Sequence, residues 1–312
     1  MLGTVQTLLT NLIDYAGLFP PAGCSMPVAA QNFARDLAGP DAFALDRFIC
    51  PASRLEELTE HGRALMPGTY ATSGYREMAH TGEPWGVSVV CDLPLEASLD
   101  AADAFNERHA DEDRGLARVR ALELRATSSA FIDEAIDAIP EEYSVFFEIP
   151  LDTDFRGMVA ALSGNPGVGG KVRCGGVTPE LIPPPDRLAS FIAACAAADV
   201  PFKATAGLHH PIRAVHALTY HPDAPRAVMH GYLNVFLAAA LARSLRLKAD
   251  QIEAILAETD HTAFVLAEDR AGWRDLAIDN TQLARCRESF CLGYGSCSFA
   301  EPLDDLRKLG WL

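Results

Sequence analysis

The stretch GGKVRCGGVTPELIPPPDRLASFIAACAAADVPFKATAGL (residues 169–208) decides the expected fold. Two short runs that favour β-strand, 169–176 and 201–208, flank a helical pattern over 186–199. A strand, a helix and a second strand at this spacing are typical of a βαβ unit, in which the two strands are parallel. The stretch therefore predicts an α/β protein built on a parallel sheet.

The same alternation continues on both sides of this unit. Further runs that favour strand lie at 12–19, 43–51, 85–94, 119–126, 143–150 and 226–234. Eight such units in about 250 residues match the usual size of a (β/α)8 (TIM) barrel. A doubly wound open sheet is the alternative, but no glycine fingerprint opens the first unit.

We therefore predict a single (β/α)8 barrel with a small C-terminal extension. The barrel is expected over residues 1–248, and residues 249–312 are expected to add a helix, a hairpin and a tail packed on it. The tail contains GSCSF (295–299), which could cover the mouth of the barrel and contribute Ser296 or Cys297 to a site.

Composition narrows the classes of partner. The net charge of −16 argues against nucleic acid and anionic membranes, and no apolar run is long enough to span a bilayer. Eight cysteines scattered singly fit a reducing, cytoplasmic setting better than a disulfide framework. We expect a small anionic substrate as partner, and a homo-oligomer is possible.

Strand alternation sends charged side chains to the inside of the expected barrel. In 143–150 the apolar Val145, Phe147 and Ile149 share one face, so Glu148 points the other way. The same reasoning turns these residues inward: Glu123, Arg125, Lys171, Arg173, Lys203 and Thr205. Because burying an unpaired ion costs several kcal/mol, inward charge at the carboxyl ends of barrel strands indicates an active site. The alternative is a salt-bridge network that only fills the barrel.

Lysine is rare in this chain, which makes its placement informative. Only Lys171, Lys203, Lys248 and Lys308 occur, and the first two lie on adjacent expected strands. Burial and nearby cations such as Arg173 lower the pKa of a lysine, and a neutral lysine can attack a carbonyl group. We expect Lys171 to be the nucleophile and Lys203 to tune it.

Two segments resemble known enzymes. GGKVRCGG (169–176) and FKATAGLHH (202–210) are similar to the sixth and seventh strands of class I Schiff-base aldolases such as deoxyribose-phosphate aldolase. The resemblance implies that Lys171 forms the Schiff base and that Lys203 depresses its pKa. The chain departs from that family after the seventh strand, where GLHHP replaces a glycine pair that binds phosphate.

A wider set of motifs resembles an uncharacterised bacterial (β/α)8-barrel family. The motifs are DYAGLFPPA (14–22), FKATAGLHHP (202–211) and GSCSF followed by EP (295–302). This resemblance spans nearly the whole chain and implies the barrel fold, but it implies no activity.

Histidines and further polar residues complete the expected site. His209 and His210 follow the seventh strand, and His230 lies in the expected eighth strand. We expect Glu148, His209 and His210 to move protons, and Arg173 and Arg125 to hold a carboxylate or phosphate. The remaining residues expected to contact substrate are Glu123, Thr205, Asp14 and His230.

The leading expectation is a lyase of aldolase type that acts on a small anionic carbonyl compound through a lysine imine. No cofactor or metal is favoured. One alternative is a metal-dependent lyase, isomerase or hydrolase that holds a divalent transition metal with Glu148, His209, His210 and His230. A non-catalytic barrel that binds a small molecule is the other alternative.

Overall fold

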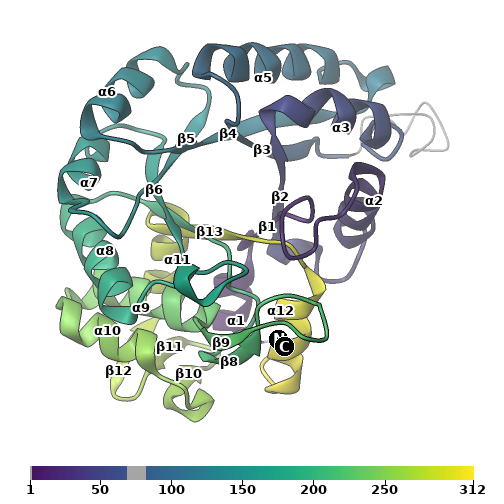
Figure 1. The fold of residues 1–312 in the computed structure, drawn as a ribbon. Helices are drawn as coiled ribbons and strands as arrows, with labels where there is room; N and C mark the ends of the chain where they lie inside the picture. The colour runs from purple at the N-terminus through teal and green to yellow at the C-terminus, as the bar shows by residue number, and fades with distance from the viewer. Residues whose placement is uncertain (1, 69–81) are drawn as a thin grey trace.

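Parallel strands close into a barrel in the computed structural model, which describes residues 2–68 and 82–312 (Figure 1). The barrel strands are β1 (Ile13–Tyr15), β2 (Leu45–Pro51), β3 (Trp85–Val90), β4 (Ala117–Arg125), β5 (Ser144–Glu148), β6 (Val168–Arg173), β7 (Phe202–Thr205) and β13 (Cys291–Ser296). Their order around the barrel is β1-β13-β7-β6-β5-β4-β3-β2. The predicted (β/α)8 barrel is therefore confirmed.

Helices surround the barrel, as Figure 1 shows for α2, α3, α5, α6, α7 and α8. Their bounds are α1 (Gly3–Leu9), α2 (Met26–Leu37), α3 (Leu55–Gly62), α5 (Leu95–His109), α6 (Ser129–Ala138), α7 (Arg156–Leu162) and α8 (Pro185–Ala198). Short 3₁₀ turns lie at Ala42–Ala44, Ala52–Arg54, Glu112–Arg114, Pro179–Leu181 and His261–Ala263. The helices that flank the barrel turn apolar side chains toward the strands. In α8, for example, the ring of Phe191 packs edge-on against Phe202 of β7, with centroids 5.6 Å apart.

The strand that closes the barrel is β13, which lies between β1 and β7. The expected eighth strand at 226–234 is wrong. Arg226–Met229 forms β9, which pairs antiparallel with β8 (Ala214–Ala217) in a separate two-stranded sheet. The barrel thus does not end at residue 248, because the segment expected to be an extension supplies one of its strands.

Two glycines explain why β13 was missed. Glycine weakens a strand, so Gly293 and Gly295 leave only a weak strand signal in the sequence of this segment. The structure needs Gly293, because a Cβ atom there would lie 2.8 Å from the Leu12 carbonyl oxygen. A Cβ atom at Gly295 would lie 3.0 Å from Cδ1 of Ile49, so this side chain would have to shift. The glycines keep the inner side of β13 open, whereas Tyr294 between them is fully buried.

The rest of the C-terminal region packs on the barrel. It comprises α9 (Tyr232–Leu245), α10 (Ala249–Ala257), α11 (Asn280–Ser289), α12 (Ala300–Lys308), β10 (Phe264–Leu266), β11 (Arg270–Trp273) and β12 (Leu276–Asp279). Helix α9 is buried from Tyr232 to Ala242, as expected for a helix that is apolar on every side. The expected hairpin near 262–279 is a three-stranded antiparallel sheet, β10-β11-β12.

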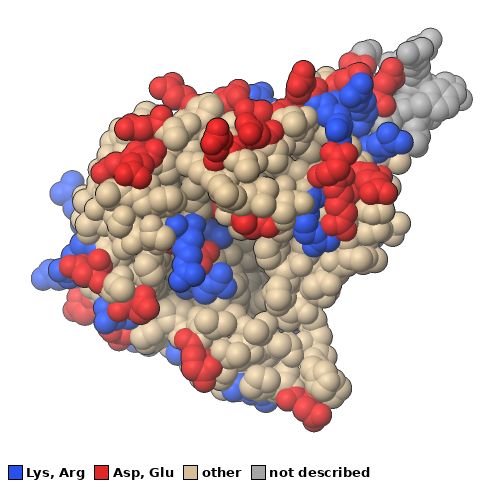
Figure 2. Space-filling model, turned by 45° about the horizontal axis from the view of Figure 1, so that its top comes forward, with Lys and Arg blue, Asp and Glu red and all other residues tan. Residues whose placement is uncertain are grey.

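The surface carries many charged groups. Figure 2 shows acidic side chains spread over much of this face, in keeping with the net charge of −16, and basic side chains gathered beside a hollow. All eight cysteines are free. None of the described helices is long and apolar enough to cross a membrane.

Removal of β13 tests the role of the chain end in the fold. A chain that ends at residue 248 is expected to lose cooperative thermal unfolding, because the edges of β1 and β7 would be left unpaired. Circular dichroism during heating measures this. A chain that ends at Leu309 keeps β13 and α12 and is the control. Cooperative unfolding of the 248-residue chain would contradict the assignment.

Candidate active site

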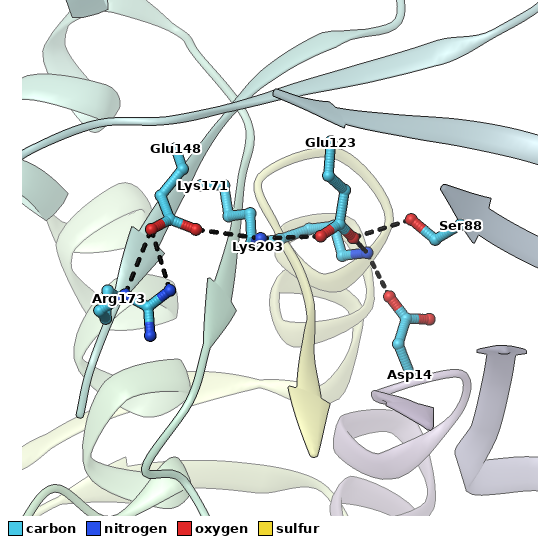
Figure 3. A network of polar contacts seen from close by, with 7 residues as sticks. All are labelled: Asp14, Ser88, Glu123, Glu148, Lys171, Arg173 and Lys203. Atoms are coloured by element: carbon cyan, nitrogen blue, oxygen red, sulfur yellow. Dashed lines mark hydrogen bonds and ion pairs between the residues drawn. The ribbon is translucent and has the colours of Figure 1, made fainter. Parts of the chain in front are cut away.

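Charged side chains from β1, β4, β5, β6 and β7 meet inside the barrel and form a continuous series of ion pairs (Figure 3). The register of the sheet places Glu148, Lys171 and Lys203 in one row across β5, β6 and β7. Glu123 on β4 and Asp14 on β1 point toward the lysines of this row. Strand alternation therefore predicted the inward direction of these side chains correctly.

Lys171 lies between two carboxylates. Its Nζ is 2.8 Å from Oε2 of Glu123 and 3.1 Å from Oε2 of Glu148, and its side chain is 9% exposed. Burial alone would lower the pKa of Lys171, but the two carboxylates outweigh burial and raise this pKa above its usual value. Lys171 is therefore protonated in the resting protein at neutral pH.

Lys203 is also held by two carboxylates. Its Nζ forms a buried ion pair with Asp14, lies 3.1 Å from Oε1 of Glu123 and sits 5.0 Å from the ring centroid of Phe146. Burial alone would lower the pKa of Lys203, but Asp14 and Glu123 raise it. The expected lowering of the pKa of Lys171 by Lys203 and Arg173 is therefore wrong in its net direction, because the two carboxylate partners of Lys171 raise this pKa.

Glu123 is the group that both lysines share. Burial alone would raise the pKa of Glu123, but Lys171 and Lys203 hold it well below its usual value. Ser88 of β3 donates a hydrogen bond of 2.8 Å to Oε1 of Glu123. Sequence reasoning missed Ser88, although it is the polar residue of the apolar strand WGVSVV (85–90), where alternation would have turned it inward.

A cavity of about 320 Å³ lies above the ion pairs at the carboxyl ends of the strands. Glu123, Glu148 and Lys171 line its polar part. The apolar part is lined by Phe19, Ile49, Val90, Val177 and Leu181. In a (β/α)8 barrel this end carries the active site in essentially every characterised enzyme, so the cavity is the candidate substrate site.

Arg173 and Glu148 form the rim of the charged cluster. Both Nε and Nη2 of Arg173 lie 3.2 Å from Oε1 of Glu148. Burial alone would raise the pKa of Glu148, but Lys171 and Arg173 lower it. The Arg173 side chain is 45% exposed, so its guanidinium group is accessible from the cavity it lines.

Thr205 and His209 line the same cavity, as expected. Nδ1 of His209 lies 3.2 Å from Oε2 of Glu301 in α12. His210 turns away to a smaller cavity of about 230 Å³, where its Nδ1 lies 2.6 Å from Oδ2 of Asp305. Of the two adjacent histidines, His209 is therefore the one that reaches the lysine cluster's cavity.

The structure does not bring Arg125 or His230 to this cavity. Arg125 is the last residue of β4, and its side chain is exposed without an ion pair to any described residue. His230 is fully buried, and its Nε2 lies 2.8 Å from the carbonyl oxygen of Pro183. Its expected position facing the site is wrong, because the strand before it belongs to the β8–β9 sheet and not to the barrel.

The alternative metal ligands are engaged by different partners. Glu148 pairs with Lys171 and Arg173, whereas His210 pairs with Asp305. Over residues 2–68 and 82–312, no group of three or more His, Cys, Asp and Glu side chains is placed to hold a metal ion. The metal-dependent alternative stays a prediction.

The chain end contributes to the site in ways that the sequence only partly indicated. Cys297 follows β13 and lines the cavity, in line with the hypothesis that the GSCSF segment contributes to the site. Glu301 and Asp305 of α12 hold the adjacent histidines and were not predicted. No spacing in the sequence links α12 to His209, so only the fold reveals this contact.

Replacement of Lys203 tests the buried ion pairs. Lys203→Met is expected to lower the free energy of unfolding by about 3–5 kcal/mol, because Asp14 would remain buried without its cation. The double variant Asp14→Asn/Lys203→Met should lose less than the single variant. Urea unfolding measures both, and the exposed Lys248→Met is the control. Equal losses in the single and double variants would contradict this explanation, because the unpaired charge of Asp14 would then not be what destabilises Lys203→Met.

Comparison of the chain with protein-family models, with curated proteins and with solved structures found no match. The resemblance to class I aldolases therefore stays a prediction. The geometry of the lysine cluster and of the cavity above it is the basis for a proposal about function.

Proposed function

We propose that the chain is a lyase of aldolase type that acts on a small anionic carbonyl compound through an imine on Lys171. One observation carries the proposal. The Nζ atom of Lys171 lies at the polar end of the cavity, within 3.1 Å of Glu148, a carboxylate that is able to take its proton. An amine, an adjacent proton acceptor and an enclosed space are the elements that imine chemistry needs.

Arg173 supports an anionic substrate. Its guanidinium group is half exposed at the cavity, and Glu148 is its one partner in the part of the chain that the structure describes. A guanidinium group binds a carboxylate or phosphate with two parallel hydrogen bonds, so a substrate anion can replace Glu148 as its partner. The apolar wall and the volume of about 320 Å³ suit a small molecule with one charged end.

Exchange of partners at Arg173 gives a route to the neutral amine. When the substrate anion binds Arg173, Glu148 loses one of the two cations that lower its pKa. Glu148 then becomes a better acceptor for the proton of Lys171, 3.1 Å away. Binding of the anion and activation of the nucleophile are thereby coupled.

The covalent steps are those of a lysine imine. The neutral Nζ of Lys171 attacks the carbonyl carbon, and the carbonyl oxygen takes up two protons and leaves as water. A base at the cavity removes the proton of a hydroxyl group on the carbon β to the imine carbon. The bond between this carbon and the α carbon then breaks, its electron pair moves toward the protonated imine nitrogen, and the fragment that carried the hydroxyl group leaves as an aldehyde or ketone. The resulting enamine takes a proton at carbon, and water then hydrolyses the imine. Glu148 and His209 are the groups at the cavity that can move these protons.

Lys203 would act differently from Lys171 in this scheme. It lines no part of the 320 Å³ cavity and stays paired with Asp14 and Glu123. Its positive charge neutralises part of the negative charge of Glu123. This limits how strongly Glu123 holds the proton on Lys171. Lys203 is therefore a positioning residue.

Reductive trapping tests the proposal. Treatment with borohydride in a pool of small aldehydes and 2-oxo acids is expected to add mass to the intact protein. Lys171→Arg should abolish the adduct, because arginine stays protonated and cannot form the imine. Lys248→Arg is the matched control. No adduct with wild type, or an adduct that survives in Lys171→Arg, would refute the imine.

The pH dependence follows from the raised pKa of Lys171. As pH rises toward this pKa the neutral fraction grows, so the rate of imine formation should increase about tenfold for each pH unit between pH 7 and 9. Glu148→Gln removes a charge that raises the pKa, so the rise should shift to lower pH. Glu142→Gln, at an exposed carboxylate that pairs with Arg118, is the control. Trapping rates measured across this range check the direction of the shift.

A second candidate function follows from the protonated state of the lysines. A protonated Lys171 is able to stabilise negative charge on a substrate oxygen, while Glu148 moves a proton at the neighbouring carbon. This would be an isomerase without a covalent intermediate. Turnover that persists in Lys171→Arg with no trapped adduct would favour this function over the lyase.

A further inference from the structure

A second cavity opens at the opposite, amino-terminal end of the barrel. Its volume is about 650 Å³, larger than the candidate substrate cavity, and it shares no lining residue with that cavity. Asp14 and Lys203 line its inner end, and Asp46, Arg47 and Arg120 lie along its wall. The interior of a small barrel is ordinarily filled by side chains, so this space needs an explanation.

Two arginines converge in this cavity because the strand between them carries a glycine. β3 lies between β2, which carries Arg47, and β4, which carries Arg120. A Cβ atom at Gly86 of β3 would lie 3.4 Å from Cγ of Arg47 and 3.9 Å from Cδ of Arg120. The register between β3 and β4 also shifts next to Arg120, since Val87 pairs with Val119 and Ser88 with Ala121. Such a bulge redirects a side chain.

The positive charge of these arginines is only partly neutralised. Asp46 is the carboxylate nearest to Arg47 by ion pairing, with Oδ2 3.3 Å from Nε of Arg47. Asp14, which pairs with Lys203, and Glu288 also line the cavity. That Nε is buried and has no hydrogen-bond partner among the described residues. The side chain of Arg120 forms no hydrogen bond or ion pair with any residue in 2–68 or 82–312, although its charge acts to lower the pKa of Asp46. Within the described residues, the guanidinium group of Arg47 therefore has one carboxylate at ion-pair distance and that of Arg120 has none.

Arg287 adds a further positive charge to the same cavity. It is buried in α11 and donates to backbone carbonyl oxygens, including those of Leu8 at 2.9 Å and Thr10 at 3.1 Å. Carbonyl groups satisfy its donors but do not cancel its charge. Lys203 is balanced by Asp14 and Glu123. The three lining arginines are then opposed by two lining carboxylates, Asp46 and Glu288, so the cavity keeps one positive charge in excess in a chain whose net charge is −16.

We propose that this cavity binds a small oxyanion, a carboxylate or a phosphate group, between Arg47 and Arg120. Guanidinium groups match both anions through pairs of parallel hydrogen bonds. An anion there would supply the charge that Asp46 alone does not, and it would give the buried Nε of Arg47 a partner. The volume leaves room for an organic group attached to the anion. The proposal does not depend on the reaction at Lys171.

Calorimetric titration of the full-length protein tests the site. Inorganic phosphate and succinate are titrated separately at constant ionic strength, and the two arms tell a phosphate site from a carboxylate site. We expect saturable binding of one anion per chain in at least one arm. Arg120→Gln should weaken it about tenfold or more, because a charge-assisted hydrogen-bonded pair is lost.

Three further variants make the result specific. Gly86→Val keeps both arginines but fills the space between them, and it should also abolish binding. Arg118 lies on β4 like Arg120 but pairs with Glu142. Arg118→Gln should therefore bind the anion as wild type does. Arg173→Gln should also bind normally, because Arg173 lies at the other cavity. Circular dichroism confirms that each variant is folded.

Three outcomes would overturn the proposal. They are the absence of saturable binding in both arms, unchanged affinity in both Arg120→Gln and Gly86→Val, and loss of binding in Arg173→Gln alone. The last outcome would place the anion in the substrate cavity. It would support the function proposed above while removing the second site.

Discussion

One buried carboxylate, Glu123, holds two ammonium groups inside the barrel, and the rest of the polar interior depends on it. Removing ions from water costs several kcal/mol each unless they are paired, so Lys171 and Lys203 are stable there only with their carboxylates in place. Those carboxylates come from β1, β4 and β5, which are far apart in sequence. The ion pairs are therefore complete only when the whole barrel has closed, including β13 from the chain end between β1 and β7.

The sequence predicted the directions of side chains better than their partners. Alternation along β4 to β7 turned Glu123, Glu148, Lys171 and Lys203 inward, because the period of a strand is a local property. The partner of each charged group depends on the register between strands, which local alternation does not reveal. The carboxylate partners raise the pKa of both lysines, whereas a lowered pKa was expected for Lys171. The predicted position of the eighth strand was wrong for a related reason. Its glycines clear space inside the barrel, a tertiary requirement that overrides local propensity.

The resting state of the cluster sets a conflict between stability and reactivity. The carboxylates that make Lys171 tolerable in the interior also keep it protonated, and a protonated amine is no nucleophile. In the proposed function Glu148 would resolve this conflict, because it is the outer partner, in contact with a half-exposed arginine. A ligand that took Arg173 from Glu148 would change the proton balance at Lys171, whereas Lys203 would stay paired with Asp14 in the interior.

The two cavities meet the same series of ion pairs from opposite ends. Lys171 and Glu123 line the cavity at the carboxyl ends, and Lys203 and Asp14 line the cavity at the amino ends. The backbone N–H of Arg47 donates a 3.1 Å hydrogen bond to Oδ1 of Asp14, and the charge of Arg47 lowers the pKa of Lys203. An anion bound at Arg47 would offset that charge and favour protonated Lys203, which binds Glu123. Glu123 also holds Lys171. A change of charge at the amino-terminal end of the barrel would therefore act on the amine of Lys171 through two contacts, Lys203 with Glu123 and Glu123 with Lys171.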